Sequence, residues 1–456
     1  MAVVVLNTQG WVLDARSLID RGYSRCIRFR NNNQKSYIKC LFKKQCFQNV
    51  KSHYSGSDAV KGGNTDMLQK TDKPSKIRSL VLEGTKSLVD SARSLGYLNG
   101  ATDTVKEPLP SQECSLAALC EMAKEIPLVE HEEHEECVQI LVAEDGCTSH
   151  VDLFSRVTEN RADDATVVTL MGEEFVIPPQ AAFLLSDFTR LQPLVHYGRR
   201  FDLIVMDPPW ENKSVKRSRR YSSLPSSQLK RLPIPLLASM NCLVVTWVTN
   251  RPSHLRFVRD ELYPHWGLEV VAEWFWVKVT TSGQFVFPLD SHHKKPYEVL
   301  VLGRYQTLEV PVDDQRLIVS VPSALHSQKP SLSEVLKPYI TAEAKCLELF
   351  ARNLQPGWTS WGNEVLKFQH TSYFTLTPTD EGTNVPKEAA SDDCTEKPTL
   401  TPVLSSPEES SRHVTGQNVS RWSSTAAWFV NHHLILEQEK QVQLENTNPT
   451  QLSKGQ

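Results

Sequence analysis

The sequence predicts a doubly wound α/β fold, and three observations support this prediction. Short, almost wholly apolar runs recur between residues 201 and 351, which is typical of strands buried on both faces of a parallel or mixed sheet. Helical patterns lie between several of these runs, as they do in layered α/β domains. Asp207 directly follows one run, at the strand end where such sheets bind their ligands. We therefore expect the functional site at the carboxyl ends of the strands.

Composition limits the classes of function. The chain has 456 residues, enough for two or three domains, and its net charge of -3 excludes a uniformly basic, nucleic-acid-coating protein. Ten cysteines without a CxxC pair predict free thiols in a reducing compartment. The opening MAVVVL has no basic segment before it and is too short to span a bilayer, so we expect neither secretion nor membrane insertion.

The first 163 residues are predicted to contain little sheet. Residues 1–75 are polar and irregular, and we expect them to be mostly loop. Apolar residues at helical spacing predict a helix over residues 77–98, and a second helical pattern covers residues 114–126. The residues that set the first spacing include Leu80, Leu82, Leu88, Val89 and Leu95. We therefore expect a small, mainly helical N-terminal domain over residues 76–163.

The main domain is expected over residues 164–369. Its first element, TVVTLMGEEFVIPP, is typical of a β-hairpin. Further strands are expected over residues 201–207, 242–248, 269–279, 297–303, 316–321 and 345–351. Helices are expected over residues 252–263 and 331–340, and Ser331 and Glu334 have the spacing of a capping box.

The last segment, residues 370–456, is predicted to be a disordered tail. It is rich in Ser, Thr, Pro and Glu and poor in apolar residues, so it cannot bury enough surface to fold alone. Residues 425–445 have a helical pattern to which we assign no function.

The stretch DPPW, residues 207–210, indicates a specific chemistry. The amino group of adenine is a poor nucleophile because its lone pair is delocalised into the ring. Hydrogen bonds to the Asp207 carboxylate and the Pro208 carbonyl can draw that nitrogen toward tetrahedral geometry, and the carboxylate opposes the positive charge that develops on it. Pro208 and Pro209 fix φ and remove competing backbone donors. Trp210 offers a ring on which an unstacked base can lie. The alternative is that Asp-Pro-Pro only ends a strand.

The sequence resembles the adenine-N6 methyltransferases named after the 70 kDa subunit of the mRNA methylase, whose signature is DPPW. The matching segments cover about residues 165–368 in the order of that family: LLSDF, FDLIVMDPPW, LVVTWVTN, EWFWVKV, LHSQKP and LELFARNLQPGWTSWGNE. The resemblance implies a Rossmann-like, S-adenosylmethionine-dependent methyltransferase fold. It also implies a permuted order of motifs, in which the catalytic half precedes the cofactor half.

The resemblance further implies roles for single residues. Asp187 and Phe188 match the pair that holds the adenine of S-adenosylmethionine, and Lys329 matches a lysine that faces the methionine carboxylate. The remaining residues expected at the cofactor are Asp207, Phe350, Arg352, Asn353, Asn363 and Glu364. These side chains suit a ligand that offers ribose hydroxyls, an adenine edge and an amino-acid head group.

The sequence departs from the family pattern in two places. ELFARN is shorter than usual between the arginine and the asparagine, which makes Asn353 a less direct match than Arg352. Glu364 stands where glutamine is more usual, so an acceptor is kept and a donor is lost. The chain also lacks the GxGxxG loop of common nucleotide-binding folds.

A basic loop follows DPPW and is the candidate binding site for RNA phosphates. Its cations are Lys213, Lys216, Arg217, Arg219 and Arg220. Because these cations lie beside a candidate catalytic carboxylate, we expect them to bind phosphates. Two alternatives for the same residues are a solvated charged face and a nuclear localisation signal. Further residues expected at the substrate are Asn212, Trp247, Asn250, His292 and Lys294, whereas Trp274 and Trp276 are expected mainly in the core.

HEEHEEC, residues 131–137, resembles a metal site at first sight. The zincin pattern, however, needs two histidines four residues apart, and His131 and His134 are three apart. We expect a solvated acidic helix here, with a site of His131, His134 and Cys137 as the alternative. Methyl transfer from a sulfonium needs no metal, and we expect none.

The resemblance implies N6-methylation of adenine in RNA, with internal 2′-O-methyladenosine of spliceosomal small nuclear RNA, which becomes m6Am, as the target. Two alternatives remain open: methylation of adenine in DNA, and a catalytically silent RNA-binding subunit of a larger complex. We expect a protein that is active as a monomer on RNA or DNA. The expected location is the nucleus, with the cytoplasm and mitochondria as alternatives.

Overall fold

The structure is a computed structural model. It describes residues 2–29, 35–48, 73–100, 138–141, 151–211, 224–291, 294–305 and 311–379, with Leu109 and Cys120, and only the backbone of residues 73–75. The chain divides into two units, Met1–Pro386 and Lys387–Gln456. All the described residues belong to the first unit.

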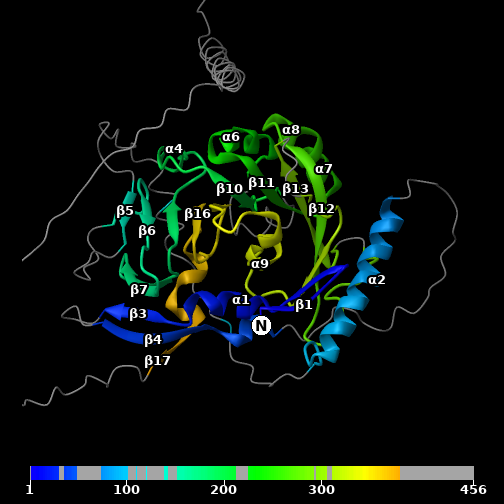
Figure 1. Cartoon of the computed structure of the whole chain (residues 1–456), viewed down its shortest axis with the longest axis horizontal. Coiled ribbons are helices and arrows are strands. Elements are labelled where there is room, and N and C mark those ends of the chain that lie inside the picture. The colour runs from blue at the N-terminus through cyan, green and yellow to red at the C-terminus, as the bar shows by residue number, and fades with distance from the viewer. Residues whose placement is uncertain are drawn as a thin grey trace, which may run out of the picture. The chain divides into compact units, whose positions relative to one another are not determined.

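A mixed sheet of twelve strands forms the centre of this unit (Figure 1). Its order is β1 (Val3–Asn7), β2 (Gly10–Leu13), β14 (Leu317–Ser320), β12 (Glu269–Lys278), β13 (Tyr297–Arg304), β11 (Ala238–Val248), β10 (Phe201–Met206), β15 (Cys346–Leu349), β16 (Trp358–Gly362), β9 (Ala182–Leu185), β6 (Val157–Glu159) and β5 (Val138–Ile140). Strands β11, β10, β15, β16 and β9 run parallel to one another. Their carboxyl ends therefore meet at one edge of the sheet, where we expected the site.

Helices cover both faces of this sheet, as a doubly wound α/β fold requires. In β10, Ile204 and Met206 belong to one apolar core, and Leu203 and Val205 belong to the other. The first core is closed by α2 (Lys73–Ser94), α4 (Gln192–His196), α6 (Ile234–Leu237), α8 (Tyr263–His265) and the π-helical turn η4 (Val258–Leu262). The second is closed by α1 (Ala15–Asp20), α9 (Ser333–Leu336) and η5 (Lys337–Tyr339). The predicted α/β class is confirmed, with a mixed sheet.

A second sheet of five strands lies beside the first (Figure 1). Its order is β17 (Phe374–Pro378), β4 (Lys35–Phe42), β3 (Cys26–Phe29), β7 (Ala165–Leu170) and β8 (Glu173–Ile177). The predicted hairpin is confirmed as the antiparallel pair β7 and β8, but it belongs to this smaller sheet. Among the described residues, the remaining short helices are η1 (Arg21–Tyr23), η2 (Lys44–Phe47), η3 (Ser226–Arg231), α7 (Pro252–Phe257), η6 (Lys367–Gln369) and η7 (Thr371–Tyr373).

The expectation of an irregular chain over residues 1–75 is wrong for the described part. Strand β2 pairs in parallel with β14, and β3 pairs with β4 and β7. These strands are only four to eight residues long, and the strands that join them to the rest of their sheets, β14, β7 and β17, lie far away in the sequence. Their order comes from those distant partners, which a local pattern does not contain.

The helix predicted over residues 77–98 is confirmed as α2, although its buried face differs from the expected one. Val81, Leu88 and Val89 are buried, whereas Leu82 and Leu95 are exposed. The region expected to be helical up to residue 163 also contributes β5 and β6 to the edge of the main sheet. Of the second predicted helix, residues 114–126, all but Cys120 lie outside the described residues, as does HEEHEEC.

The strands predicted between residues 201 and 351 are all present, and two details of the helices differ. The helix expected over residues 252–263 is continuous through α7, η4 and α8, with a π-helical middle. The capping box is wrong: α9 begins after Leu332, the Ser331 hydroxyl accepts from the Ser333 amide at 3.2 Å, and Glu334 pairs with Arg21 at 3.1 Å.

The predicted disordered tail begins later than residue 370. Residues 371–373 form η7, and β17 pairs with β4 from Phe374 to Pro378. The rest of the tail, including residues 425–445, lies outside the described residues. No helix in the described part of the chain is long and apolar enough to cross a membrane.

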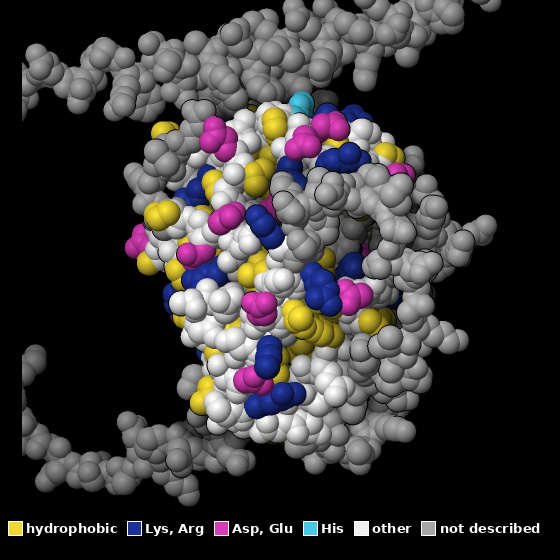
Figure 2. All heavy atoms as spheres, turned by 90° about the vertical axis from the view of Figure 1, so that its right-hand side faces the viewer, with side chains coloured by type: hydrophobic (Ala, Val, Ile, Leu, Met, Phe, Trp, Pro, Cys, Tyr) yellow, Lys and Arg dark blue, Asp and Glu magenta, His cyan; other side chains and the backbone are white. Residues whose placement is uncertain are grey.

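The face that carries α2 shows basic and acidic side chains interspersed, without a field of one sign among the described residues (Figure 2). On α2, for example, Arg78 pairs with Asp290 at 2.8 Å.

Candidate active site

Asp207 stands where the sequence placed it, at the carboxyl end of β10. Its amide donates to the carbonyl of Leu349 at the end of the neighbouring strand β15, at 3.4 Å. The Trp210 amide donates to the Pro208 carbonyl at 2.8 Å and closes a three-residue turn around Pro209, whose fixed φ suits such a turn. The Pro208 carbonyl is therefore already engaged by one donor, contrary to the expectation that the prolines leave it without backbone competition. Its second lone pair remains for another donor.

Trp210 is buried rather than open. Its indole nitrogen donates to the carbonyl of Trp247 in β11 at 2.8 Å, and its ring stacks on His254 with centroids 4.9 Å apart. Only 5% of the residue is exposed, so both ring faces are covered in this arrangement. The structure thus gives Trp210 a place in the core beneath the turn, where no base can lie on it unless the ring moves.

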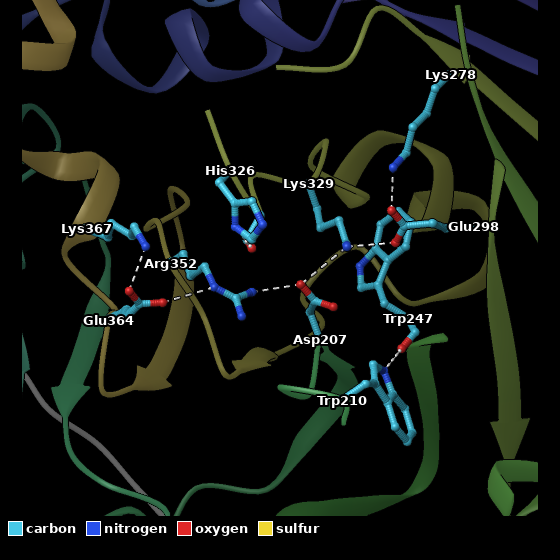
Figure 3. Close-up of polar contacts among 11 residues, drawn as sticks. Asp207, Trp210, Trp247, Lys278, Glu298, His326, Lys329, Arg352, Glu364 and Lys367 are labelled. Carbon is cyan, nitrogen blue, oxygen red and sulfur yellow. Dashed lines mark hydrogen bonds and ion pairs between the residues drawn. The ribbon is translucent and has the colours of Figure 1, made fainter. Parts of the chain in front are cut away.

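Asp207 is the centre of a network of ion pairs (Figure 3). Its Oδ2 atom contacts the Arg352 guanidinium at 2.7 Å and the Lys329 ammonium at 3.5 Å. Arg352 follows β15, and Lys329 lies in the HSQKP segment. The fold therefore brings Asp207 together with Lys329 and Arg352, two residues that the sequence also placed at the site and that lie more than 100 residues further along the chain.

The network extends in both directions from this centre, and positive and negative groups alternate along it. Lys329 contacts Glu298 of β13 at 2.7 Å, and Glu298 also pairs with Lys278 of β12. On the other side, Arg352 contacts Glu364 at 3.3 Å, and Glu364 contacts Lys367 at 2.6 Å. Figure 3 shows this chain of contacts spanning the carboxyl edge of the sheet from β12 to the residues after β16.

The network changes the acidity of its members. Burial disfavours the charged form of Glu298, but Lys329 and Lys278 outweigh it and hold the pKa of Glu298 at about 2. Burial acts against the charged form of Lys329 in the same way, and Asp207 and Glu298 nevertheless raise its pKa. The pKa of Glu364 is lowered because Lys367 and Arg352 outweigh its burial. These groups are charged together at neutral pH.

Glu348 is the exception among the carboxyl groups near this edge. It lies in β15 and accepts a hydrogen bond from the Gln355 amide at 2.9 Å. Burial raises its pKa to about 7, and nearby Asp207 acts in the same direction. A carboxyl group that changes charge near neutral pH therefore lies next to the network.

The expected cofactor residues lie around the same edge. Phe188, after β9, and Phe350, after β15, stack with ring centroids 6.4 Å apart. Phe350 has a φ of 58°, a rare value for a residue with a side chain, which indicates that the surrounding structure fixes this turn. Asp187 accepts from the Thr189 amide at 3.0 Å, and Asn363 is exposed after β16.

A cavity of about 330 Å³ adjoins the network. Lys329 and Asn353 line it together with Gln328 and residues of α1 and η1. The buried Gln328 side chain has an Oε1 atom without a hydrogen-bond partner among the described residues. The N-terminal residues thus form one wall of a cavity at the site, a contribution that the sequence did not indicate.

The residues expected at the substrate are only partly described. Asn212, the five cations of the basic loop and His292 lie outside the described residues. Trp247 is buried and faces Trp276 edge-on at 5.5 Å, so it forms core rather than an open wall. Trp274 and Trp276 are buried as expected. Asn250 is exposed and donates to the Tyr297 carbonyl, and Lys294 is exposed with its ammonium 5.3 Å from the Phe287 ring.

Sequence reasoning missed Glu298, Lys278, Lys367 and His254. Glu298 ends the motif HKKPYE and Lys278 lies in EWFWVKV, so both stand at strand ends of the same edge. A charged residue at the end of an otherwise apolar strand is the signal that could have identified them.

Comparison with known proteins gives a consistent result. Residues 201–364 match the model of the family described as MT-A70. The chain is 53% identical to the Homo sapiens N(6)-adenine-specific methyltransferase METTL4 over 327 residues, which is 68% of this chain and 69% of the relative. It is 36% identical to the Pyricularia oryzae N6-methyladenosine RNA methyltransferase MTA1, over 47% of this chain and 59% of the relative. It is 37% identical to a Caenorhabditis elegans DNA N6-methyl methyltransferase, over 45% of this chain and 56% of the relative.

Proposed function

Since the chain belongs to the MT-A70 family and is an adenine-N6 methyltransferase, we propose that it uses S-adenosylmethionine to methylate adenine in RNA. The proposed target is internal 2′-O-methyladenosine of a small nuclear RNA. The observation that carries the proposal is the arrangement of Asp207. Arg352 and Lys329 both contact its Oδ2 atom. The Asp207 carboxylate is thereby held beside the Pro208 carbonyl at the end of a parallel strand.

These two acceptors suit the amino group of adenine. Asp207 Oδ1 accepts from one of its N–H groups and the Pro208 carbonyl from the other, which localises the lone pair on nitrogen. The carboxylate then faces the nitrogen as positive charge develops there, and Oδ1 holds the proton that the nitrogen must lose. Arg352 fixes the orientation of the carboxylate by its contact with Oδ2.

The residues present fit the cofactor. Its amino-acid head group needs charged partners, and Lys329, lining a cavity of about 330 Å³, supplies an ammonium group. Asn353 in the same cavity, with Arg352 and Asn363, suits the ribose hydroxyls. The Asp187 carboxylate and the stacked rings of Phe188 and Phe350 suit an adenine edge and face. When bound, S-adenosylmethionine supplies an electrophilic methyl group on a sulfonium.

The order of the motifs suits a permuted methyltransferase. Asp207 follows β10, and Arg352 and Glu364 follow the later strands β15 and β16 on one side of it. On this proposal the catalytic strand comes first in the chain and the cofactor strands complete the sheet.

The relatives support a nucleic-acid substrate without choosing between its types. One is named an RNA methyltransferase and another a DNA methyltransferase. We favour RNA on the resemblance of the whole set of motifs, and DNA is the second candidate. The basic loop, including Lys213 and Arg217, is proposed to hold flanking phosphates. A nuclear location and action as a monomer are proposed with this substrate.

One assay tests the substrate. Labelled S-adenosylmethionine is offered with matched RNA oligonucleotides that carry adenosine or 2′-O-methyladenosine at the target, and with single-stranded DNA of the same sequence. We expect label on the 2′-O-methylated RNA and none with Asp207→Ala. Equal labelling of both RNAs would reject the 2′-O-methyl preference. Label on DNA alone would reject RNA in favour of the second candidate.

A further inference from the structure

His254 lies beside the catalytic turn and has no role in the function described above. It belongs to α7, which follows β11, and only 5% of it is exposed. Its imidazole ring stacks on the indole of Trp210 with an angle of 23° between the planes. A polar, titratable ring is therefore buried against the last residue of DPPW.

Two hydrogen bonds hold His254 in place. Its Nδ1 atom hydrogen-bonds to the Thr249 hydroxyl at 2.8 Å, and Thr249 directly follows β11. The His254 amide donates to the Arg251 carbonyl at 3.0 Å in the first turn of the helix. Burial lowers the pKa of the imidazole, and Arg251 lowers it further while Glu211 opposes this. The ring is therefore neutral at pH 7 and its position is set by strand β11.

Trp210 is also anchored to strand β11, through the nitrogen at the edge of its indole ring. Its indole nitrogen donates to the Trp247 carbonyl, and its amide donates to the Pro208 carbonyl. The Pro209 carbonyl accepts from the Leu224 amide at 3.0 Å. Pro208 and Pro209 have fixed φ angles, so few soft torsions separate the indole from the Asp207 carboxylate. A shift of the Trp210 backbone is therefore passed on to the Pro208 carbonyl and to the Asp207 backbone that carries the carboxylate.

We propose that His254 is a positioning residue: by stacking on Trp210 it fixes the direction in which Asp207 Oδ1 and the Pro208 carbonyl face the reacting amino group. The inference rests on the proposed function for its catalytic consequence. On this proposal, Trp210 supports the catalytic turn and is itself held in place by contacts with β11 and α7.

Variants at two positions can separate the effect of the imidazole ring from the effect of its hydrogen bond to Thr249. His254→Phe keeps a flat ring on the indole and loses the bond to Thr249, whereas His254→Ala loses both. Thr249→Val removes the hydrogen bond alone. If stacking is the positioning contact, His254→Phe and Thr249→Val should resemble the wild type and His254→Ala should not. His265→Ala, which changes an exposed histidine in the neighbouring α8, is the matched control.

Two readouts are measured on the full chain: steady-state methyl transfer, and hydrogen exchange of the peptide over residues 205–211. For His254→Ala we expect kcat to fall by about 100-fold, the loss typical of a misplacement near 1 Å. The KM for RNA and the Kd for S-adenosylmethionine should stay within about twofold, and exchange of the turn amides should become faster. His254→Phe should recover kcat to within about threefold.

The outcomes are distinguishable. Wild-type kcat and exchange in His254→Ala would overturn the proposal, and so would a failure of His254→Phe to recover either. If His254→Ala does not fold, a loss of kcat in a folded His254→Phe overturns the proposal and wild-type behaviour there supports it. If the wild type transfers no methyl group to any oligonucleotide, the proposed function fails, and the exchange data still decide whether His254 fixes the turn.

Discussion

The two sides of Asp207 are built from different interactions. On the side of β11 and α7, the catalytic turn rests on neutral rings and hydrogen bonds, through Trp210, Trp247 and His254. Toward Lys329 and the residues that follow β15 and β16, alternating charges hold the carboxylate by ion pairs. Shape fixes the first side and charge fixes the second. The first should therefore respond to ring volume, and the second to pH and salt.

The largest effect on catalysis is expected at Asp207, where the two sides meet. Asp207→Asn keeps the size of the side chain but removes its charge and leaves Arg352 and Lys329 without their shared partner. We expect kcat to fall by about 100- to 1000-fold, as for other electrostatic groups aimed at a transition state. Methyl transfer at saturating RNA measures it. A fall of less than tenfold would show that the carboxylate acts only through its shape.

Removing the ring tests the neutral side. Trp210→Ala empties a buried indole site, and we expect the free energy of unfolding to fall by about 3–5 kcal/mol. Urea denaturation at low and high salt measures it. Because no charge is involved, the loss should be the same at both salt concentrations, and a loss that shrinks in salt would contradict the comparison. Trp210→Phe, which keeps a ring, is the control.

Glu298→Gln tests the charged side. The pKa of Glu298 is lowered from 4.5 to about 2, so its stabilisation is fully present above pH 4.5 and is lost as the pH falls through 2. The amide should therefore cost about 3 kcal/mol at pH 7, and the difference from the wild type should shrink toward pH 2. Urea midpoints between pH 3 and pH 7 measure it. A pH-independent difference would mean that packing is lost rather than charge.

Glu348→Gln should change the free energy of unfolding in the opposite direction, because it should stabilise the protein at high pH. Burial raises the pKa of Glu348 from 4.5 to about 7, so the stability linked to its protonation is present below pH 4.5 and lost as the pH rises through 7. At pH 8 the carboxylate is buried at a cost that the amide avoids, and the amide still accepts from Gln355. We expect the variant to be more stable by about 1–3 kcal/mol at pH 8 and equal near pH 4. Thermal unfolding at both pH values checks this, and equal stability at pH 8 would contradict it.

The smallest effect is expected at Glu364. Glu364→Gln restores the residue more usual in the resembling family and keeps an acceptor for Arg352. We expect the Kd for S-adenosylmethionine to change by no more than about fivefold, or about 1 kcal/mol. Calorimetry measures it. A larger loss would show that the charge of Glu364, rather than its hydrogen bonds, holds the end of the network.

The sequence predicted the strands around the site well because each is an apolar run that must be buried wherever it lies. It also placed Asp207, Lys329, Arg352 and Glu364 at one site, which the network now joins by direct contacts. It did not predict that Trp210 is clamped. A tryptophan after a turn has the same local pattern whether its ring is open or covered, and later residues, among them Trp247 and His254, decide which.

The N-terminal strands were missed for a related reason. GWVL and CIRF are too short to be distinguished from loop, and Glu298 is one charge in a polar motif until β13 pairs with β11 and β12. In each case the deciding information lies in a partner far away in the chain. Patterns within ten residues cannot contain it.

The pairing of β2 with β14 also determines when this part of the sheet can form during translation. Residues 10–13 pair locally with β1, but their second partner is at residues 317–320, so the β1–β2 hairpin joins the rest of the sheet only after about 300 further residues. At ordinary rates of translation this delay is about 15–60 s. During that time the apolar GWVL segment has only β1 to pair with, and its other edge has no neighbouring strand.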